Sequence, residues 1–369
     1  MSTLVEQPFE ANTPSGLRVK GKMRTSIVIS DPVPPLETTW GKLRGVNWIS
    51  GVLNGNLPSG IATADIKKFM AILHNLGCNF IRIVGYWDSY EKDKKAYTDE
   101  LKAIIGAADD LGIVAFYDNH QWHFGGSFAP DSKGIPARYY SGYHGVNLAG
   151  DYDGSPNSRV LWADFWSNTL KNGLNPWLDM KIYWAEIIDA IDSFDNLLGY
   201  EILNEPRTTA IGDYAKLGAF NSAIGAFIND NSTKKVFFCR DNGIAGYNAN
   251  NAERPRMIPA GASNLVYDAH MYRVSAIDQI VNQTKAVVAS RPDIPVVIGE
   301  TATDPKYGTA ITKENAKVIL NRCKAEGFSM NYWAFGCWSC GLGKKLVGKD
   351  GALQPEANTF RDAIKEVYA

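Results

Sequence analysis

Long apolar runs, an excess of charge of either sign and a second close pair of cysteines are all missing from this sequence. No stretch approaches the roughly 20 apolar residues that cross a bilayer, and the first residues, MSTLVEQPFEANTP, lack the basic and then apolar pattern of a signal peptide. The 38 basic and 39 acidic residues leave a net charge of −1, without a basic block or an acidic tail. We therefore expect a neutral substrate, and neither a nucleic acid nor a membrane as partner.

Sequence signatures of cofactor and metal sites are missing as well. No G-x-G-x-x-G follows the first apolar segment, no G-x-x-x-x-G-K-[ST] occurs, and the chain contains no His-x-His. Of the five cysteines, Cys337 and Cys340 form the one close pair, in CWSC. Because the further ligands of a zinc site are lacking, loop thiols or a local disulfide are favoured over metal or redox chemistry. We expect no metal and no organic cofactor.

Short apolar segments alternate with helical patterns from residue 41 onward. Eight of these segments read as buried strands: LRGVNW, NFIRIV, IVAFYD, LLGYEILN, KVFFC, NLVYDAH, PVVIGE and FSMNYWAF. Helical patterns cover residues 64–76, 99–111, 176–191, 213–228, 276–289, 313–326 and 355–367. Eight alternations predict an α/β fold and favour a closed (β/α)₈ TIM barrel over its rival, an open doubly wound sheet.

Two segments depart from this alternation. Residues 1–40 are rich in Pro, Thr and Ser, and the alternating stretch 17–29, with Gly21 in its middle, is typical of a β-hairpin. We expect residues 1–40 to form an N-terminal arm that packs on the barrel or stays free, and residues 41–369 to form one catalytic domain. Residues 120–175, after the third strand, are rich in Gly, Tyr, Trp, Asp and Ser, and we interpret them as a long, ordered insertion.

Polar and aromatic side chains gather at the ends of the predicted strands, which is where barrel enzymes build their sites. In chain order they are Asn47, Trp48, Arg82, Trp87, Asp118, Asn119, His120, Trp122, Asn204, Glu205, His270, Tyr272, Glu300, Trp333 and Trp338. We expect these acids, imidazoles and indoles to converge with one guanidinium on one mouth of the barrel.

Glu205 and Glu300 are the candidate catalytic pair. Cleavage of a glycosidic bond needs one carboxylic acid that protonates the leaving oxygen and one carboxylate that captures the oxocarbenium-like carbon. Neighbouring carboxyl groups push each other's pKa apart, and a guanidinium such as that of Arg82 favours the ionised partner. Either acid alone could be an ordinary solvated or helix-terminal group, but the two together, with Asn204 adjacent, indicate catalysis.

The chain from about residue 41 to its C-terminus resembles glycoside hydrolase family five, the retaining cellulases and mannanases. The residues that carry this resemblance follow one another in the order Arg82, His120, Asn204, Glu205, His270, Tyr272, Glu300 and Trp333. The resemblance implies that Glu205 is the acid/base and Glu300 the nucleophile. It implies that Asn204 binds the 2-hydroxyl of the sugar, and that Arg82 and Tyr272 position Glu300.

The same resemblance implies that His120 and His270 line the subsite of the two acids and that Trp333 forms its floor. Four further indoles are either flanking sugar platforms or packing under loops: Trp48, Trp87, Trp122 and Trp338.

The sequence therefore predicts a retaining endo-β-1,4-glucanase, a cellulase that cleaves cellulose-type glucan by double displacement through a glycosyl-Glu300 intermediate. The alternatives are an endo-β-1,4-mannanase or another β-glycoside hydrolase of the same family, a barrel that only binds carbohydrate, and a metal-dependent hydrolase. The expected partner is a polysaccharide or oligosaccharide bound by a monomer. Its substrate class favours a secreted, extracellular protein, although the chain shows no signal peptide.

Overall fold

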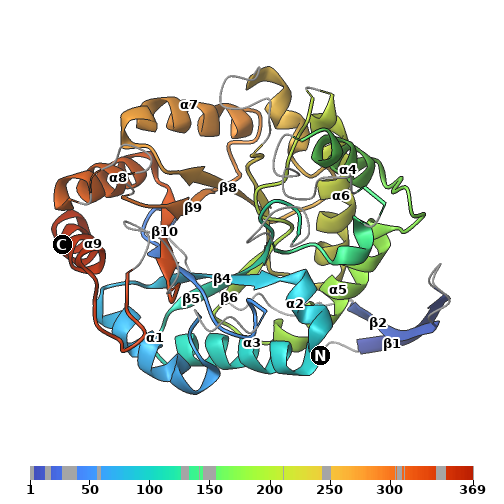
Figure 1. The fold of residues 1–369 in the computed structure, drawn as a ribbon, viewed down its shortest axis with the longest axis horizontal. Coiled ribbons are helices and arrows are strands. Elements are labelled where there is room, and N and C mark those ends of the chain that lie inside the picture. The colour runs from blue at the N-terminus through green and yellow to red at the C-terminus, as the bar shows by residue number, and fades with distance from the viewer. Residues whose placement is uncertain are drawn as a thin grey trace.

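The computed structural model describes residues 4–12, 18–26, 40–55, 60–125, 133–140, 142–143, 155–210, 212–242, 251–303, 305, 310, 312–337 and 346–368. Eight parallel strands form a closed barrel in the order β10-β3-β4-β5-β6-β7-β8-β9. Figure 1 shows the helices arranged around this ring of strands. The predicted TIM barrel is confirmed, and its rival, the open doubly wound sheet, is excluded.

The barrel strands coincide with the apolar segments of the sequence. They are β3 (Arg44–Trp48), β4 (Phe80–Tyr86), β5 (Val114–His120), β6 (Leu197–Glu201), β7 (Lys235–Cys239), β8 (Leu265–Met271), β9 (Val296–Thr301) and β10 (Ser329–Phe335). Nearly all of their residues are buried, because helices cover the outer face of the sheet and side chains fill its interior.

Each predicted helical pattern corresponds to a helix. The α-helices are α1 (Ile66–Asn75), α2 (Trp87–Lys92), α3 (Lys94–Asp109), α4 (Pro156–Ser167), α5 (Pro176–Ile191), α6 (Asp213–Asn231), α7 (Ile277–Val288), α8 (Lys313–Glu326) and α9 (Pro355–Tyr368). Shorter 3₁₀ helices are η1 (Thr63–Asp65), η2 (Ala137–Tyr139), η4 (Asn251–Met257) and η5 (Val274–Ala276). Among the described residues, no helix combines the length and apolar character needed to cross a membrane. The helices α2 and α4 were not predicted.

The N-terminal segment forms a hairpin in a different place from the predicted one. The strands β1 (Leu4–Asn12) and β2 (Arg18–Ser26) pair antiparallel in a sheet of their own. Gly21 lies inside β2, opposite Phe9, so the prediction of a hairpin within residues 17–29 was wrong. Alternation alone could not reveal that this stretch pairs with residues upstream of it. The packing of this arm on the barrel stays a prediction.

The described part of the insertion 120–175 carries an aromatic cluster. The ring of Phe124 lies edge-on to those of Trp162 and Phe165, with centroids 4.7 and 5.4 Å apart. Trp162 also stacks on Trp166 at 4.9 Å, and all four side chains are buried. Burial of such rings stabilises the attachment of α4 to the segment that follows β5.

Side chains that point into the barrel form layers along its axis. The first layer is apolar, with the ring of Phe116 5.3 Å from that of Phe80 and 4.3 Å from that of Phe237. Two residues further along β4 and β5, the alternation of side chains directs Arg82 and Asp118 into the barrel. The polar groups at the carboxyl ends of the strands therefore pack against this apolar layer.

Candidate active site

The guanidinium of Arg82 on β4 organises the floor of the site. Its Nε and Nη2 donate to the two carboxylate oxygens of Glu201 at 2.8 and 2.9 Å. Nη1 lies 3.0 Å from Oδ2 of Asp118, and Nε lies 3.3 Å from Oδ2 of Asp268. Burial would lower the pKa of Arg82, but the surrounding acids outweigh burial and raise it further. The wholly buried cation is therefore surrounded by acids from three other strands of the barrel, β5, β6 and β8.

The pKa values of these buried acids are shifted in opposite directions. Burial acts to raise the pKa of Glu201, but the charge and hydrogen bonds of Arg82 prevail and lower it. For Asp118 and Asp268, burial prevails and raises the pKa well above its usual value. Glu201, which receives two hydrogen bonds from Arg82, is the acid of the floor whose ionised form the guanidinium stabilises most directly.

Glu300 lies at the end of β9, where two hydrogen bonds orient its carboxylate. Oε1 accepts from Nη1 of Arg82 at 3.1 Å, and Oε2 accepts from the hydroxyl of Tyr272 at 2.5 Å. The residue is 5% exposed, so one edge of the carboxylate can reach a ligand in the mouth. The two hydrogen bonds hold the carboxylate in the fixed orientation that a nucleophile needs.

The pairing of β8 with β9 shifts by one residue immediately before Glu300. Ala269 pairs with Ile298 and His270 with Glu300, so Gly299 is skipped in the pairing. The N–H of Gly299 donates to Oδ1 of Asp268 at 2.7 Å, and a Cβ at position 299 would meet the same carboxylate at 2.1 Å. Glycine is therefore required next to the catalytic candidate.

Glu205 follows β6 in a left-handed backbone conformation, with φ of 37°. Its Oε1 accepts from Nδ1 of His270 at 2.7 Å, and its Oε2 accepts from the amide of Asn242 at 2.6 Å. Burial acts to raise the pKa of Glu205, but the hydrogen bond and charge of His270 outweigh it and lower the pKa to about 2. Burial likewise acts to lower the pKa of His270, and the charges of Glu300 and Glu205 raise it instead. Both shifts favour the proton on the imidazole.

The two catalytic candidates face each other across His270. One carboxylate oxygen of Glu205, one of Glu300 and a ring nitrogen of His270 all lie within 4.8 Å of one another. Retaining glycosidases hold their carboxyl groups about 5 to 5.5 Å apart, whereas inverting ones leave about 6.5 to 9.5 Å for a water molecule. An approach of 4.8 Å or less between single carboxylate oxygens is compatible with the shorter separation.

Asn204 connects Arg82 with the end of β5 through its side-chain amide. Its Oδ1 accepts from Nη2 of Arg82 at 2.8 Å, and its Nδ2 approaches Nε2 of His120 at 3.2 Å and the carbonyl of Gln121 at 3.0 Å. Both amide hydrogens are thereby engaged. A sugar hydroxyl could bind Asn204 only by donating to Oδ1.

His120 is held as a neutral imidazole. Burial lowers its pKa to about 3, and its Nδ1 lies 2.6 Å from Oδ2 of Asp118. Because Nε2 accepts from Asn204, the proton belongs on Nδ1. The ring of Trp333 stacks on that of His120, with centroids 5.4 Å apart and an interplanar angle of 21°. The predicted site residues at the ends of β5, β6, β8, β9 and β10 therefore do come together.

The four indoles that were candidate sugar platforms differ in exposure. Trp48 and Trp87 are 0% and 1% exposed, so the interpretation of either as a platform was wrong, because no ring face is open to a sugar. Trp48 packs 5.6 Å from Phe335 in the core. Trp122 is 39% exposed and stays a candidate, while Trp338 lies outside the described residues. Cys340 of the CWSC motif also lies outside them, and Cys337 is disulfide-bonded.

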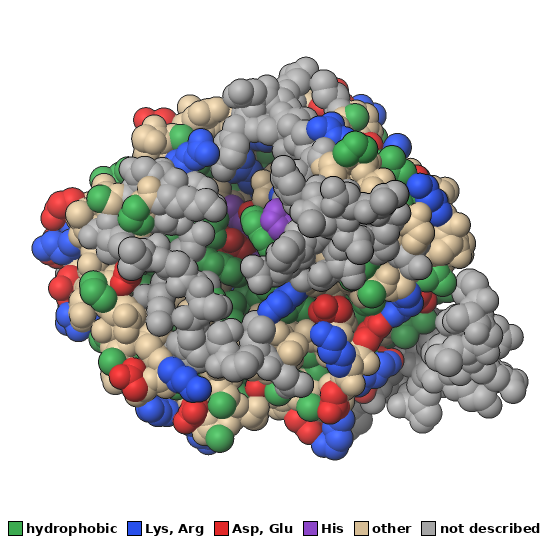
Figure 2. All heavy atoms as spheres, viewed as in Figure 1, with side chains coloured by type: hydrophobic (Ala, Val, Ile, Leu, Met, Phe, Trp, Pro, Cys, Tyr) green, Lys and Arg blue, Asp and Glu red, His purple; other side chains and the backbone are tan. Residues whose placement is uncertain are grey.

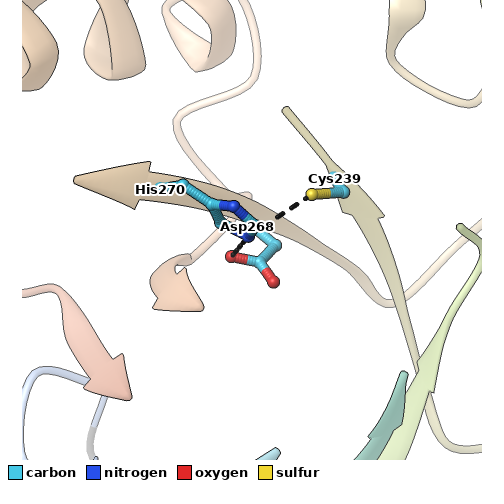
Figure 3. Close-up of side chains that lie close together, drawn as sticks. All are labelled: Cys239, Asp268 and His270. Carbon is cyan, nitrogen blue, oxygen red and sulfur yellow. Dashed lines mark hydrogen bonds and ion pairs between the residues drawn. The ribbon is translucent and has the colours of Figure 1, made fainter. Parts of the chain in front are cut away.

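Figure 2 shows the molecule from the same side as Figure 1, with all heavy atoms drawn. Acidic and histidine side chains are visible there in a hollow near the centre. Beneath it, Cys239 from β7 and Asp268 and His270 from β8 point toward one another (Figure 3). Sγ of Cys239 lies 3.6 Å from Nε2 of His270 but already accepts the N–H of Glu205 at 3.3 Å. Burial raises the pKa of Cys239 well above its usual value, which disfavours the thiolate that a metal needs. The cluster is explained as support for His270 and Glu205.

Several residues of the site were missed in the sequence. They are Gln121, Glu201, Cys239, Asn242 and Asp268. A signal existed for Glu201 and Asp268, since each is a charged residue inside an apolar strand segment, as Arg82 is. The loop residues Gln121 and Asn242 carry no such signal, because their role depends on the fold alone.

Comparison with known proteins places this geometry in context. A family model described as cellulase (glycosyl hydrolase family 5) matches residues 45–337. An endoglycoceramidase from Cyanea nozakii is 24% identical over 165 residues, 37% of this chain, and the match spans only 32% of the length of that relative.

Solved structures of two proteins share the fold over most of the chain. Endo-glycoceramidase II from Rhodococcus sp., as a lactosyl-enzyme intermediate and as a complex with ganglioside GM3, superposes with a TM-score of 0.67 at 20% and 19% identity, covering 86% of this chain and 78% of that one. A β-glucanase from Saccharophagus degradans gives a TM-score of 0.60 at 16% identity, covering 100% of this chain and 94% of the other. At these identities, the likeness establishes the fold alone.

Proposed function

Because the chain belongs to the cellulase family, glycosyl hydrolase family 5, we propose that it is a retaining β-glycoside hydrolase with Glu300 as nucleophile and Glu205 as acid/base. The observation that carries this proposal is the approach of the two carboxylates to within 4.8 Å on either side of His270. Arg82 and Tyr272 support the assignment, because both donate hydrogen bonds that orient Glu300.

The proposed reaction has two displacements. A Glu300 oxygen attacks the anomeric carbon, the bond from that carbon to the leaving oxygen breaks, and Glu205 gives its proton to that oxygen. Glu205 then takes a proton from water, whose oxygen attacks the same carbon and releases Glu300.

The proton of the first step belongs to the Glu205–His270 pair. In the substrate-free site it resides on His270, since the pKa of Glu205 is lowered to about 2 and that of His270 is raised. Transfer along the 2.7 Å bond from Nδ1 to Oε1 makes Glu205 the acid and His270 neutral. A sugar that displaces water from the mouth favours this transfer, because desolvation penalises the charged pair more than the neutral one.

For the substrate, we propose the oligosaccharide headgroup of a glycolipid, cleaved at the bond to its lipid. The endoglycoceramidases of Cyanea nozakii and Rhodococcus sp. support this class, the latter through its complex with ganglioside GM3. A β-glucan is the second candidate, supported by the full-length superposition on a β-glucanase. The exposed indole of Trp122 suits either substrate as a sugar platform. Action outside the cell remains part of the proposal.

Product analysis of the purified protein tests both parts. Lactosylceramide, ganglioside GM3, carboxymethylcellulose, mixed-linkage glucan, mannan and xylan would be incubated side by side. We expect release of an intact oligosaccharide from the glycolipids, with the β-anomer formed first when NMR follows the reaction. Cleavage of the polymers alone would overturn the glycolipid proposal, and initial formation of the α-anomer would overturn the retaining mechanism.

A further inference from the structure

Gln121, the first residue after β5, makes three hydrogen bonds around the acid/base candidate. Its Nε2 donates to the backbone carbonyls of Asn204 and Glu205 at 2.9 and 2.8 Å, and its Oε1 accepts the N–H of Phe124 at 2.9 Å. The side chain is 1% exposed. Carbonyls only accept and an N–H only donates, so the amide has a single possible orientation.

The backbone that Gln121 holds is in an unfavourable conformation. Glu205 has φ of 37°, in the left-handed region that is strained for a residue with a Cβ. Such a conformation persists only where its surroundings fix it. Here Gln121 binds the carbonyl of Glu205, and Sγ of Cys239 accepts its N–H. The two contacts fix the peptide planes on both sides of the Glu205 Cα.

Gln121 itself lies at the start of the insertion 120–175, next to two further residues with an unusual backbone conformation. His123 and Phe124 are also left-handed, with φ of 55° and 71°. The N–H and carbonyl of Trp122 pair with the backbone of Lys133 at 2.8 and 3.1 Å. The same glutamine therefore connects the exposed indole of Trp122 with the turn that carries the acid.

We propose that Gln121 is a positioning residue that sets the direction from which Glu205 delivers its proton to the leaving oxygen. The inference rests on the proposed function, in which Glu205 is the general acid. Glu300 receives no hydrogen bond from Gln121; its donors are Arg82 and Tyr272. Loss of the Gln121 amide therefore impairs proton delivery and leaves nucleophilic attack intact.

Proton delivery and nucleophilic attack can be separated by the leaving group. Departure of dinitrophenolate needs no proton, whereas departure of phenolate is assisted by one. The rate constant kcat/KM reports the steps up to and including the first displacement. A misdirected acid therefore lowers kcat/KM for a phenyl glycoside and spares that for the dinitrophenyl glycoside of the same sugar.

The test uses Gln121→Met, which keeps the length of the side chain without its amide, and Gln121→Ala in case methionine disturbs folding. Gln283 is the matched control, since it is a buried glutamine, 6% exposed, whose Oε1 accepts from Arg254 at 3.3 Å. Phenyl and dinitrophenyl β-lactosides and β-cellobiosides would be compared for the wild type, both Gln121 variants, Gln283→Met and Glu205→Ala.

We expect the Gln121 variants to lose roughly tenfold to hundredfold in kcat/KM on the phenyl glycoside and little on the dinitrophenyl glycoside, as part of the effect of an acid catalyst. Glu205→Ala should show the same split more strongly, and Gln283→Met no split. An equal loss on both substrates, or no loss, in folded Gln121 variants would overturn the inference. If Glu205→Ala itself shows no split, the acid assignment fails first, and the inference with it.

Discussion

Nδ1 of His270 lies 2.7 Å from Oε1 of Glu205, the shorter of its two approaches to the catalytic candidates, since Oε2 of Glu300 is 3.6 Å away. The imidazole thus stands between both acids but bonds one of them. This asymmetry assigns the shared proton to the Glu205 side of the mouth. Glu300 instead accepts hydrogen bonds from Arg82 and Tyr272.

The Glu205–His270 pair predicts a pH window for stability. The lowered pKa of Glu205 contributes stability above its ordinary value of 4.5, and this is lost as pH falls toward about 2. The raised pKa of His270 contributes stability below its ordinary value of 6.5, and this is lost as pH rises through the folded value. We expect Glu205→Gln to lower the free energy of unfolding most between these two ordinary values, as measured by urea denaturation across pH.

Glu366 provides the control for this window. Its pKa is also lowered to about 2, but by Lys313 and Lys317 at the protein surface. Ion pairs between exposed groups contribute little and are screened by salt, so Glu366→Gln should change stability only slightly. A Glu205→Gln effect that is equally small at every pH would contradict the buried pair.

Glu300→Gln should abolish turnover and leave the fold intact. The amide keeps the shape of the carboxylate but cannot act as nucleophile, so kcat should fall by at least about a thousandfold while Tm stays near that of the wild type. A 2-fluoro glycoside that traps the intermediate should label the peptide containing Glu300 in the mass spectrum. Labelling of another acid would show that the nucleophile lies elsewhere.

Tyr272→Phe should lower kcat/KM more than stability. The hydroxyl donates to Oε2 of Glu300 at 2.5 Å from a half-buried ring, and a hydrogen bond to a charged group contributes about 1.5–3 kcal/mol. If that contribution is realised in the transition state, kcat/KM falls by roughly tenfold to hundredfold. A change in Tm without a change in kcat/KM would mean that the hydroxyl is structural.

Arg82→Met should destabilise the barrel by about 3–5 kcal/mol, because it leaves the buried carboxylate of Glu201 without its cation. The double variant Arg82→Met/Glu201→Gln should recover part of this loss in urea denaturation. Arg82→Lys keeps the charge but not the fork that reaches Glu201 and Glu300 together, so it should retain more stability than activity. Equal stability of the single and double variants would show that Glu201 is neutral in the folded protein.

Much of this arrangement could be predicted because the carboxyl ends of all eight barrel strands meet at one end of the barrel. Residues near those ends in the sequence are therefore expected to lie close together in space. His120, Asn204, His270, Glu300 and Trp333 were found as polar or aromatic groups near strand ends, and Arg82 was found as a charge inside an apolar strand. Trp48 was misjudged for the same reason, since a residue at a strand end can point outward into the core as well as inward. Gln121 and Asn242 could not be predicted, because they act on Glu205 through contacts between separate loops.

The glycine beside Glu300 has a consequence for how this molecule can change. The carboxylate of Asp268 occupies the space that a Cβ at position 299 would need, and the same Asp268 is tied to Arg82. A substitution at any of these three positions therefore requires compensation at the others. Substitutions that change substrate choice are therefore expected in the loops that follow the strands, such as the insertion 120–175, rather than at these three positions.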